Sequence, residues 1–187
     1  GPGACQADVS AATSATPVLS IPHQLPATSG GKVTVPIRLQ TNGSAVNSLL
    51  FAVNYDEKAL NFDAADNNHD GIPDAITFTL PQPFLNSVTF DKQGANGELH
   101  FVVTGFSSPP TALKDGPLLS VTFDVAQLPT ATETAVQIAQ LPAASFADTQ
   151  GRALGGATVS GSVLIADRPA PTASATLLYL PLIVTNH

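Results

Sequence analysis

The chain has 187 residues, of which 43% are hydrophobic and only 11% are charged, and its formal net charge is −7. This length suits one domain of ordinary size with a proper core. Its seven lysines and arginines are dispersed, which argues against a nucleic-acid partner because phosphate binding needs clustered cations. Low charge with many Thr, Val and Pro residues indicates a β-rich secreted protein rather than a cytosolic enzyme.

The first segment, residues 1–17, is rich in Ala, Ser and Thr and is predicted to be a linker or an extended arm. It contains the single cysteine, Cys5, which therefore cannot form an internal disulfide. Cys5 could carry a lipid, join an intermolecular disulfide or stay a free thiol. The sequence contains no methionine, so we expect either a removed signal peptide or a protease-cleavage remnant at residues 1–3.

The body of the domain is predicted to span residues 18–167 and to begin with a strand at Val18–Ile21. Residues Lys32–Leu39 alternate strictly between apolar and other side chains, which predicts a strand with one buried face. Pro36 cannot donate to a sheet ladder, so this strand should lie at an edge or carry a bulge there. A further strand is predicted at Val46–Tyr55.

An acidic loop follows, in which oxygen-bearing side chains occupy positions 1, 3, 5 and 9 of the nonapeptide Asp66–Asp74, with Gly71 at position 6. This is the spacing of a calcium loop. Six of the fourteen acidic residues of the chain fall between Asp56 and Asp74, which favours cation binding. The predicted side-chain ligands are Asp66, Asn68 and Asp70. Ile72 would bind through its carbonyl, and Asp74 would bind directly or through a water molecule.

The predicted metal of this loop is Ca²⁺, because hard oxygen ligands select it and the lone His69 argues against zinc. Position 12 of the loop is Thr77 rather than Glu, so the loop is not a complete EF-hand. A missing ligand could come from Asp63 or from a distant loop. The alternative is a solvated Asn/Asp turn without metal.

More short strands are predicted after this loop, separated by turn signals such as Asn96-Gly97 and Asp115-Gly116. With the earlier ones they make about nine strands, a number and spacing typical of an all-β, two-sheet antiparallel sandwich. The later strands are expected at Ala75–Thr79, Ser87–Asp91, Gly97–Thr104, Leu118–Val125, Thr134–Ile138 and Thr158–Ile165.

The chain ends with a Pro/Ala/Thr linker at residues 168–176 and an apolar segment at residues 177–187, predicted to be a strand. An exposed strand this apolar would promote aggregation, so it should be buried. It could lie in a groove of its own sandwich, lie on a neighbouring subunit, or be a removed or anchored sorting tail. It is too short to span a membrane. The candidate partner-binding side chains are Leu178, Leu180, Leu182 and Val184.

The strand pattern resembles that of cohesin modules over roughly residues 18–166. The matching segments are Gly31–Leu39, Phe51–Asp56 with Leu60, Leu118–Val125 and Gly161–Ile165. The resemblance implies a jelly-roll sandwich and a protein-binding role, since cohesins hold dockerins through one sheet face. No partner-binding residue of that face is carried over, because no invariant side chain defines it.

The sequence departs from the cohesin pattern in two places. Glu57 stands where a proline commonly follows the Tyr-Asp pair. The acidic loop is similar to the calcium loops of thrombospondin type 3 repeats and dockerins, here inserted after the third strand. In addition, residues 178–182 resemble short terminal motifs of surface-exported bacterial proteins.

These features favour a non-catalytic, calcium-stabilised interaction module that works outside the cell, at its surface. The leading hypothesis is self-assembly, in which the terminal strand of one copy completes the sandwich of the next. The alternative is a cohesin-like receptor for a dockerin-type partner. Carbohydrate binding has little support because the chain has no tryptophan. An enzyme is disfavoured, since the four histidines have no local partners and no serine lies in a nucleophile elbow.

Overall fold

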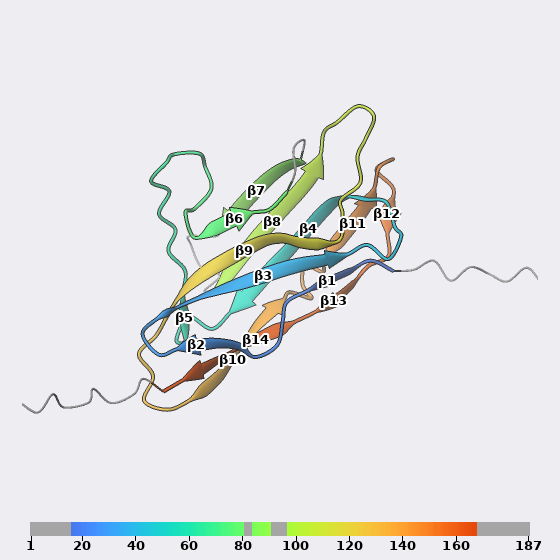
Figure 1. Ribbon diagram of the computed structural model, residues 1–187. Helices are drawn as coiled ribbons and strands as arrows, with labels where there is room; N and C mark the ends of the chain where they lie inside the picture. Colours follow the sequence, from blue (N-terminus) through green and yellow to red (C-terminus); the bar gives the residue numbers. More distant parts are fainter. Residues whose placement is uncertain (1–15, 81–83, 91–96, 168–187) are drawn as a thin grey trace, which may run out of the picture.

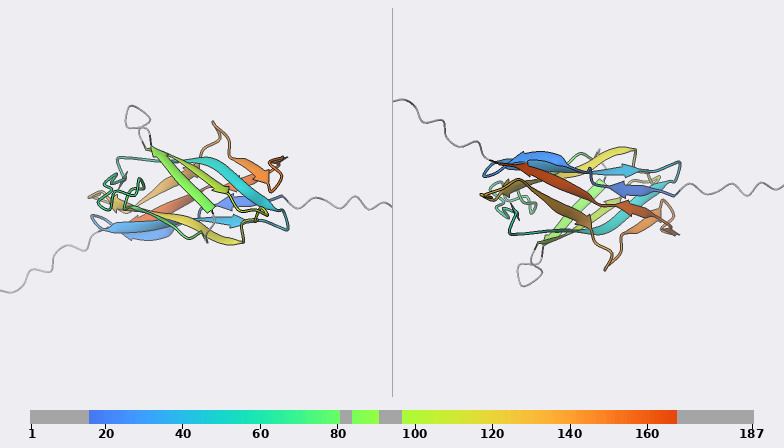
Figure 2. Two further views of the ribbon diagram at one scale, coloured as in Figure 1. Left: turned by 90° about the horizontal axis from the view of Figure 1, so that it is seen from above. Right: turned by 90° about the horizontal axis from the view of Figure 1, so that it is seen from below.

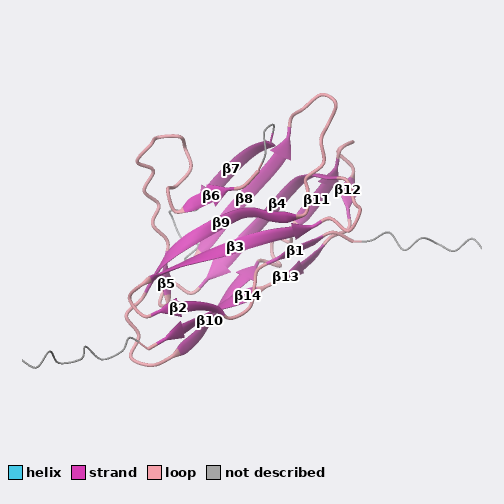
Figure 3. Ribbon diagram, viewed as in Figure 1, coloured by secondary structure: helices cyan, strands magenta, loops and turns pink. Residues whose placement is uncertain are grey.

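The computed structural model describes residues 16–80, 84–90 and 97–167. Within these residues all regular structure is β-strand, as the colouring in Figure 3 shows. The same residues therefore contain no helix long and apolar enough to cross a membrane. The strands are β1 Val18–Ser20, β2 Leu25–Thr28, β3 Lys32–Gln40, β4 Val46–Tyr55, β5 Leu60–Asn61, β6 Ile76–Phe78, β7 Phe84–Phe90, β8 Glu98–Gly105, β9 Gly116–Val125, β10 Thr132–Ile138, β11 Ser145–Asp148, β12 Ala153–Leu154, β13 Ala157–Val159 and β14 Gly161–Ala166.

The strands form two sheets that pack face to face (Figure 1 and Figure 2). One sheet has six strands in the order β13-β1-β3-β9-β5, with β6 also paired to β9. The other has eight strands in the order β12-β11-β4-β10-β14-β2, and β8 and then β7 extend it from β4. The predicted jelly-roll sandwich is thus confirmed.

The core lies between the two sheets and follows from the period-two alternation of the strands. Leu99, Phe101 and Val103 of β8 are buried, and so are the inward residues of β9. The ring of Phe101 stacks on Phe51 of β4 at a centroid distance of 5.1 Å. These inward residues fix which side chains of β4 and β8 are left on the outer face.

The last predicted strand, Thr158–Ile165, is divided in the structure at Ser160. β13 lies in the six-stranded sheet beside β1, and β14 lies in the eight-stranded sheet beside β2. Both pairings are parallel, whereas all the other strand pairs described are antiparallel. A Cβ atom on Gly161 would lie 2.1 Å from the Pro22 carbonyl oxygen, so the two chain segments change sheets in close contact.

Pro36 lies in the interior of the six-stranded sheet order, where β3 stands between β1 and β9. The pairing of β3 with β1 ends at Arg38, so Pro36 has a described partner only on the β9 side. The register of β3 with β9 shifts between Ile37 and Arg38. The structure therefore places Pro36 in a stretch of β3 that is unpaired on its β1 side and next to an irregularity in the β9 register, which tolerates the missing N–H.

Candidate functional site

The outer face of β4 and β8 is the first candidate surface. Since Leu49, Phe51 and Val53 of β4 enter the core, the residues between them point away from it. Four cross-strand pairs result on the outer face, one above the other along the two strands. They are Ser48 with Thr104, Leu50 with Val102, Ala52 with His100, and Asn54 with Glu98.

An apolar pair occupies the middle of this face. The side chain of Leu50 is 49% exposed although it lies in the centre of a long strand. Val102, its partner on β8, is half-buried. Fully burying a leucine side chain is worth about 1.5–3 kcal/mol, so a partner that covers the exposed half of Leu50 gains roughly half of that.

Polar groups flank the apolar pair on both sides along the strands. The hydroxyls of Ser48 and Thr104 lie 3.1 Å apart and share a hydrogen bond. On the other side, His100 Nε2 lies 2.7 Å from Glu98 Oε1. The amide oxygen of Asn54, next in line, is buried and has no hydrogen-bond partner in the part of the chain that the structure describes.

A groove continues this face where β4 and β10 diverge. The two strands pair only from Val53 to Tyr55 of β4, and the earlier part of β10 pairs with β14 alone. Asn54, Asp56, Glu133 and Gln137 line the groove. The Ser162 hydroxyl donates to Glu133 Oε1 at 2.6 Å, so this exposed carboxylate is held in place.

Further exposed apolar side chains lie in loops that follow β8 and β10. Phe106 directly follows β8 and is 66% exposed. Leu141 is 90% exposed, and its loop interrupts the pairing of β4 between β10 and β11. Ala139 N–H, at the base of that loop, donates to the Ala52 carbonyl at 2.8 Å. Leu141 is therefore presented by a loop that is anchored to β4.

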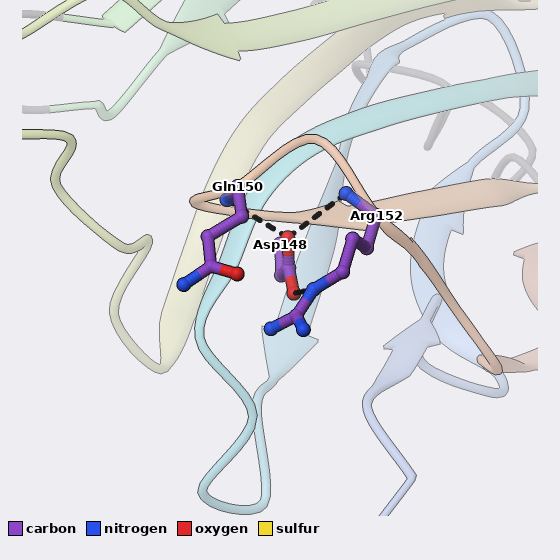
Figure 4. A network of polar contacts seen from close by, with 3 residues as sticks. All are labelled: Asp148, Gln150 and Arg152. Atoms are coloured by element: carbon purple, nitrogen blue, oxygen red, sulfur yellow. Dashed lines mark hydrogen bonds and ion pairs between the residues drawn. The ribbon is translucent and has the colours of Figure 1, made fainter.

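The edge of the same sheet at β11 carries a self-contained ion pair, shown in Figure 4. Arg152 Nε lies 3.0 Å from Asp148 Oδ2. The backbone N–H groups of Arg152 and Gln150 donate to Asp148 Oδ1 at 2.9 and 2.8 Å. These contacts, the Arg152 backbone bond foremost, hold the pKa of Asp148 below its usual range. The charge of Asp148 is thus compensated within the chain.

The outer face of the six-stranded sheet is chemically different. Lys32 Nζ pairs with Asp124 across β3 and β9, and this hydrogen bond raises the pKa of Lys32. The hydroxyls of Thr34 and Thr122 lie 3.0 Å apart in the neighbouring pair. The polar groups at the centre of this face are therefore paired with one another.

The acidic loop adopts a tight, internally hydrogen-bonded turn. Asp66 accepts from the N–H of Asp70 at 3.2 Å and from that of Gly71 at 2.9 Å. Gly71 has a φ of 87°, a left-handed conformation that glycine adopts without steric cost. Asp70 in turn accepts from the Ile72 N–H at 2.8 Å. The position-6 glycine therefore has the turn-forming role that the sequence indicates.

The donor set of the loop suits Ca²⁺, but its carboxylates are engaged with the loop itself. Asp74 Oδ2 accepts from the side chain and backbone N–H of Asn67. Asp63 Oδ1 accepts from the Ala65 N–H at 2.9 Å. Among the described residues no three His, Cys, Asp or Glu side chains gather closely enough to hold a metal ion. Loading the loop would require Asp74 to turn from Asn67, and the calcium site stays a prediction.

Two other predicted features lie outside the described residues. They are Cys5 and the terminal segment with Leu178, Leu180, Leu182 and Val184. The sequence analysis, in turn, named no side chains of the β4–β8 face. A signal was present, because Leu50 and Val102 are apolar residues at positions where the alternation calls for polar ones.

The chain is a two-sheet β-sandwich with a partly apolar outer face on the β4–β8 sheet. A family model described as the cohesin domain matches residues 19–165. The chain therefore belongs to the cohesin family. No curated protein matches it.

Several solved structures share the fold. The seventh ScaB type I cohesin from Pseudobacteroides cellulosolvens is 21% identical with a TM-score of 0.56, and the match covers 92% of this chain and 99% of that one. The cohesin module of a Clostridium perfringens family 33 glycoside hydrolase is 13% identical, with a TM-score of 0.61 and coverage of 82% and 98%. The sixth cohesin of Acetivibrio cellulolyticus scaffoldin B, solved in complex with a Cel5 dockerin mutant, is 20% identical, with a TM-score of 0.56 and coverage of 81% and 99%.

Proposed function

We propose that this chain is a non-catalytic protein-interaction module that binds a dockerin-type partner through the outer face of β4 and β8. Membership of the cohesin family over residues 19–165 is the observation that carries this proposal. Solved relatives with the same fold were captured with dockerins, including the scaffoldin B cohesin and a type I cohesin from Clostridium thermocellum. We favour dockerin binding over self-assembly, because membership of the cohesin family supports dockerin binding directly.

The choice of face rests on the contrast between the two outer surfaces. On the six-stranded sheet, Lys32 pairs with Asp124 and Thr34 with Thr122. A partner that covers these groups would therefore gain little binding free energy. On the β4–β8 face, Leu50 leaves half of its side chain exposed. Binding energy is usually concentrated in a few such residues near the centre of an interface. The β4–β8 face therefore offers the larger gain on docking.

The proposal also includes where the module works. Low charge, Thr- and Pro-rich flanking segments and the calcium-loop spacing favour an extracellular, cell-surface position. We propose Ca²⁺ as a structural ion of the 66–74 loop, where Asp66, Asn68, Asp70, the Ile72 carbonyl and Asp74 would hold it. This ion would order the connection between β5 and β6 rather than take part in docking.

The test measures binding of a panel of dockerin modules to the immobilised full chain by calorimetry and pull-down. We expect a one-to-one complex with at least one dockerin, and its loss in Leu50→Asp. The matched control is Thr34→Asp, which adds the same charge to an exposed strand position of the opposite face. Binding that survives Leu50→Asp but fails in Thr34→Asp would place the interface on the other sheet.

A further inference from the structure

The charge on the docking face is not evenly distributed along its strands. In the middle of the face Leu50 and Val102 are apolar, and toward one end the exposed Phe106 is apolar and Asp148 is neutralised by Arg152. Toward the other end lie Glu98 and the groove carboxylates Asp56 and Glu133. The face is therefore uncharged from its middle to one end and acidic toward the other.

The acidic end is not compensated within the described part of the chain. There, the ion pairs made by lysine or arginine side chains are Lys32–Asp124 and Arg152–Asp148. His100 lies beside Glu98, but the carboxylates of Asp56 and Glu133 have no cationic partner among the described residues. Asn54, between them and the apolar pair, has a buried amide oxygen without a donor in this part of the chain. Among the described residues, the groove therefore lacks a positive charge.

We infer that the partner presents an apolar patch to Leu50 and Val102 and a Lys or Arg side chain to the groove between β4 and β10. Leu50 and Asn54 are four residues apart on one strand, so the two contacts lie about 13 Å apart. A basic side chain would supply the positive charge that the groove lacks and would donate its N–H groups to the carboxylates of Asp56 and Glu133. This separation sets the spacing of the apolar and basic groups on the partner. The inference rests on the proposed docking face and specifies the chemistry of the ligand for that face.

The groove carboxylates can be neutralised without removing their structural hydrogen bonds. Glu133→Gln keeps an oxygen that can accept from the Ser162 hydroxyl. Asp56→Asn keeps an oxygen for the Lys58 N–H, which Asp56 Oδ1 now accepts at 2.9 Å. Asp124→Asn is the matched control, since it removes one carboxylate charge from the opposite outer face. Melting curves establish that each variant is folded before binding is measured.

The probes are two synthetic helical peptides that differ only in charge. Both carry leucines on one face, and about nine residues further along the same face one carries two lysines and the other two glutamines, because a helix rises about 1.5 Å per residue. Fluorescence anisotropy gives the Kd of each peptide for the full chain. We expect the lysine peptide to bind about two- to thirtyfold more tightly, because each of the two exposed ion pairs contributes about 0.2–1 kcal/mol.

The variants separate this inference from the proposed docking face. We expect the preference for lysine to disappear in the Asp56→Asn, Glu133→Gln double variant and to persist in Asp124→Asn. Equal binding of the two peptides, no binding of either, or a preference unchanged in the double variant overturns the basic-group inference. Leu50→Asp should weaken both peptides alike. If it weakens neither, the docking face itself is wrong, whatever the groove binds.

Discussion

Leu50 of β4 and Val102 of β8 lie directly opposite each other in an antiparallel pair, with both side chains on the outer face of the sheet. Leu50 is 49% exposed, yet its two neighbours in the strand are almost completely buried. The strand thus uses one side for the core, while Leu50 on the other side is open to water in the free molecule.

This arrangement predicts that Leu50 can be replaced with little cost to the fold. We expect Leu50→Ser to lower the free energy of unfolding by only about 1 kcal/mol, because about half of the Leu50 side chain is buried in the free chain. In contrast, Leu49→Ser, one residue earlier and fully buried, should lose about 2–5 kcal/mol. Urea denaturation of both variants checks the pair. Similar losses in the two would show that Leu50 contributes to the core.

The calcium-loop proposal predicts a metal-dependent melting temperature. At calcium a hundredfold above its dissociation constant, binding would add about 2.7 kcal/mol to the free energy of unfolding. Removing calcium with a chelator should therefore lower the Tm of the parent chain. It should leave Asp70→Ala unchanged, because that variant lacks a predicted ligand. A chelator that leaves the parent chain unchanged contradicts the site.

Because Tyr55 is half-buried, we expect the fold to lose stability at alkaline pH. Burial raises the pKa of Tyr55 to about 12, and the charge of Glu57 adds to the rise. The folded state thus favours the neutral phenol, while the unfolded state ionises near the ordinary value of 10.0. This contribution is complete below pH 10 and declines as pH rises toward about 12.

The measurement is an ultraviolet titration of Tyr179→Phe, in which Tyr55 is the remaining tyrosine. Its absorbance should change near pH 12 while the chain is folded, and Tyr55→Phe should remove this part of the alkaline destabilisation. Ionisation of folded Tyr55 near pH 10 would show that its ring is not sequestered against Phe123, with which it makes a ring contact at 4.8 Å.

We expect any side chain in place of Gly97, just before β8, to lower the stability of the fold strongly. Its φ is +68°, and a Cβ atom there would lie 2.1 Å from the Tyr55 carbonyl oxygen. The left-handed conformation alone costs an alanine about 1–2 kcal/mol, and the contact adds to it. Gly97→Ala should therefore lower the Tm clearly. Gly155→Ala, where nothing lies within 4 Å of the added atom, is the control and should melt like the parent chain.

Long alternating strands could be predicted from the sequence because their pattern is local. The structure has β4 at Val46–Tyr55, as predicted, and β3 extends the predicted Lys32–Leu39 by one residue. The expected Leu118–Val125 begins two residues earlier, at Gly116. In each case alternating burial requires a period of two, which a single sequence displays.

Other strands were missed because their pairing depends on distant partners. β2 contains Pro26, a residue depleted in strands, and is held by its parallel partner β14. β5 and β12 have two residues each, too few to show alternation. The described residues contain fourteen strands, five more than the nine expected: β2, β5, β11 and β12 have two to four residues each, and the fifth arises because Thr158–Ile165 is divided into β13 and β14. No local pattern signals that Thr158–Ile165 divides between two sheets.

The two parts of the candidate site differ in the same way, since one has a local sequence signal and the other depends on distant pairing. The spacing of the 66–74 loop indicated ligands because oxygen atoms and a glycine at fixed positions are a local signal. The β4–β8 face was not foreseen residue by residue, because it forms only when strands far apart in sequence pair. Leu50 lies beside Val102 on this face only because β4 pairs with β8, and Val102 stands fifty-two positions later in the chain.

The two parallel pairings have a mechanical consequence. Ala157 N–H donates to the Pro17 carbonyl, so the beginning of β1 lies beside the beginning of β13. The chain then runs from Ala157 to Ala166 along the sandwich, about 30 Å at the rise of a strand. A pulling force between residues 17 and 166 would load the hydrogen bonds of both parallel pairs together, in shear. We therefore expect the described domain to resist tension along this direction until many hydrogen bonds break at once.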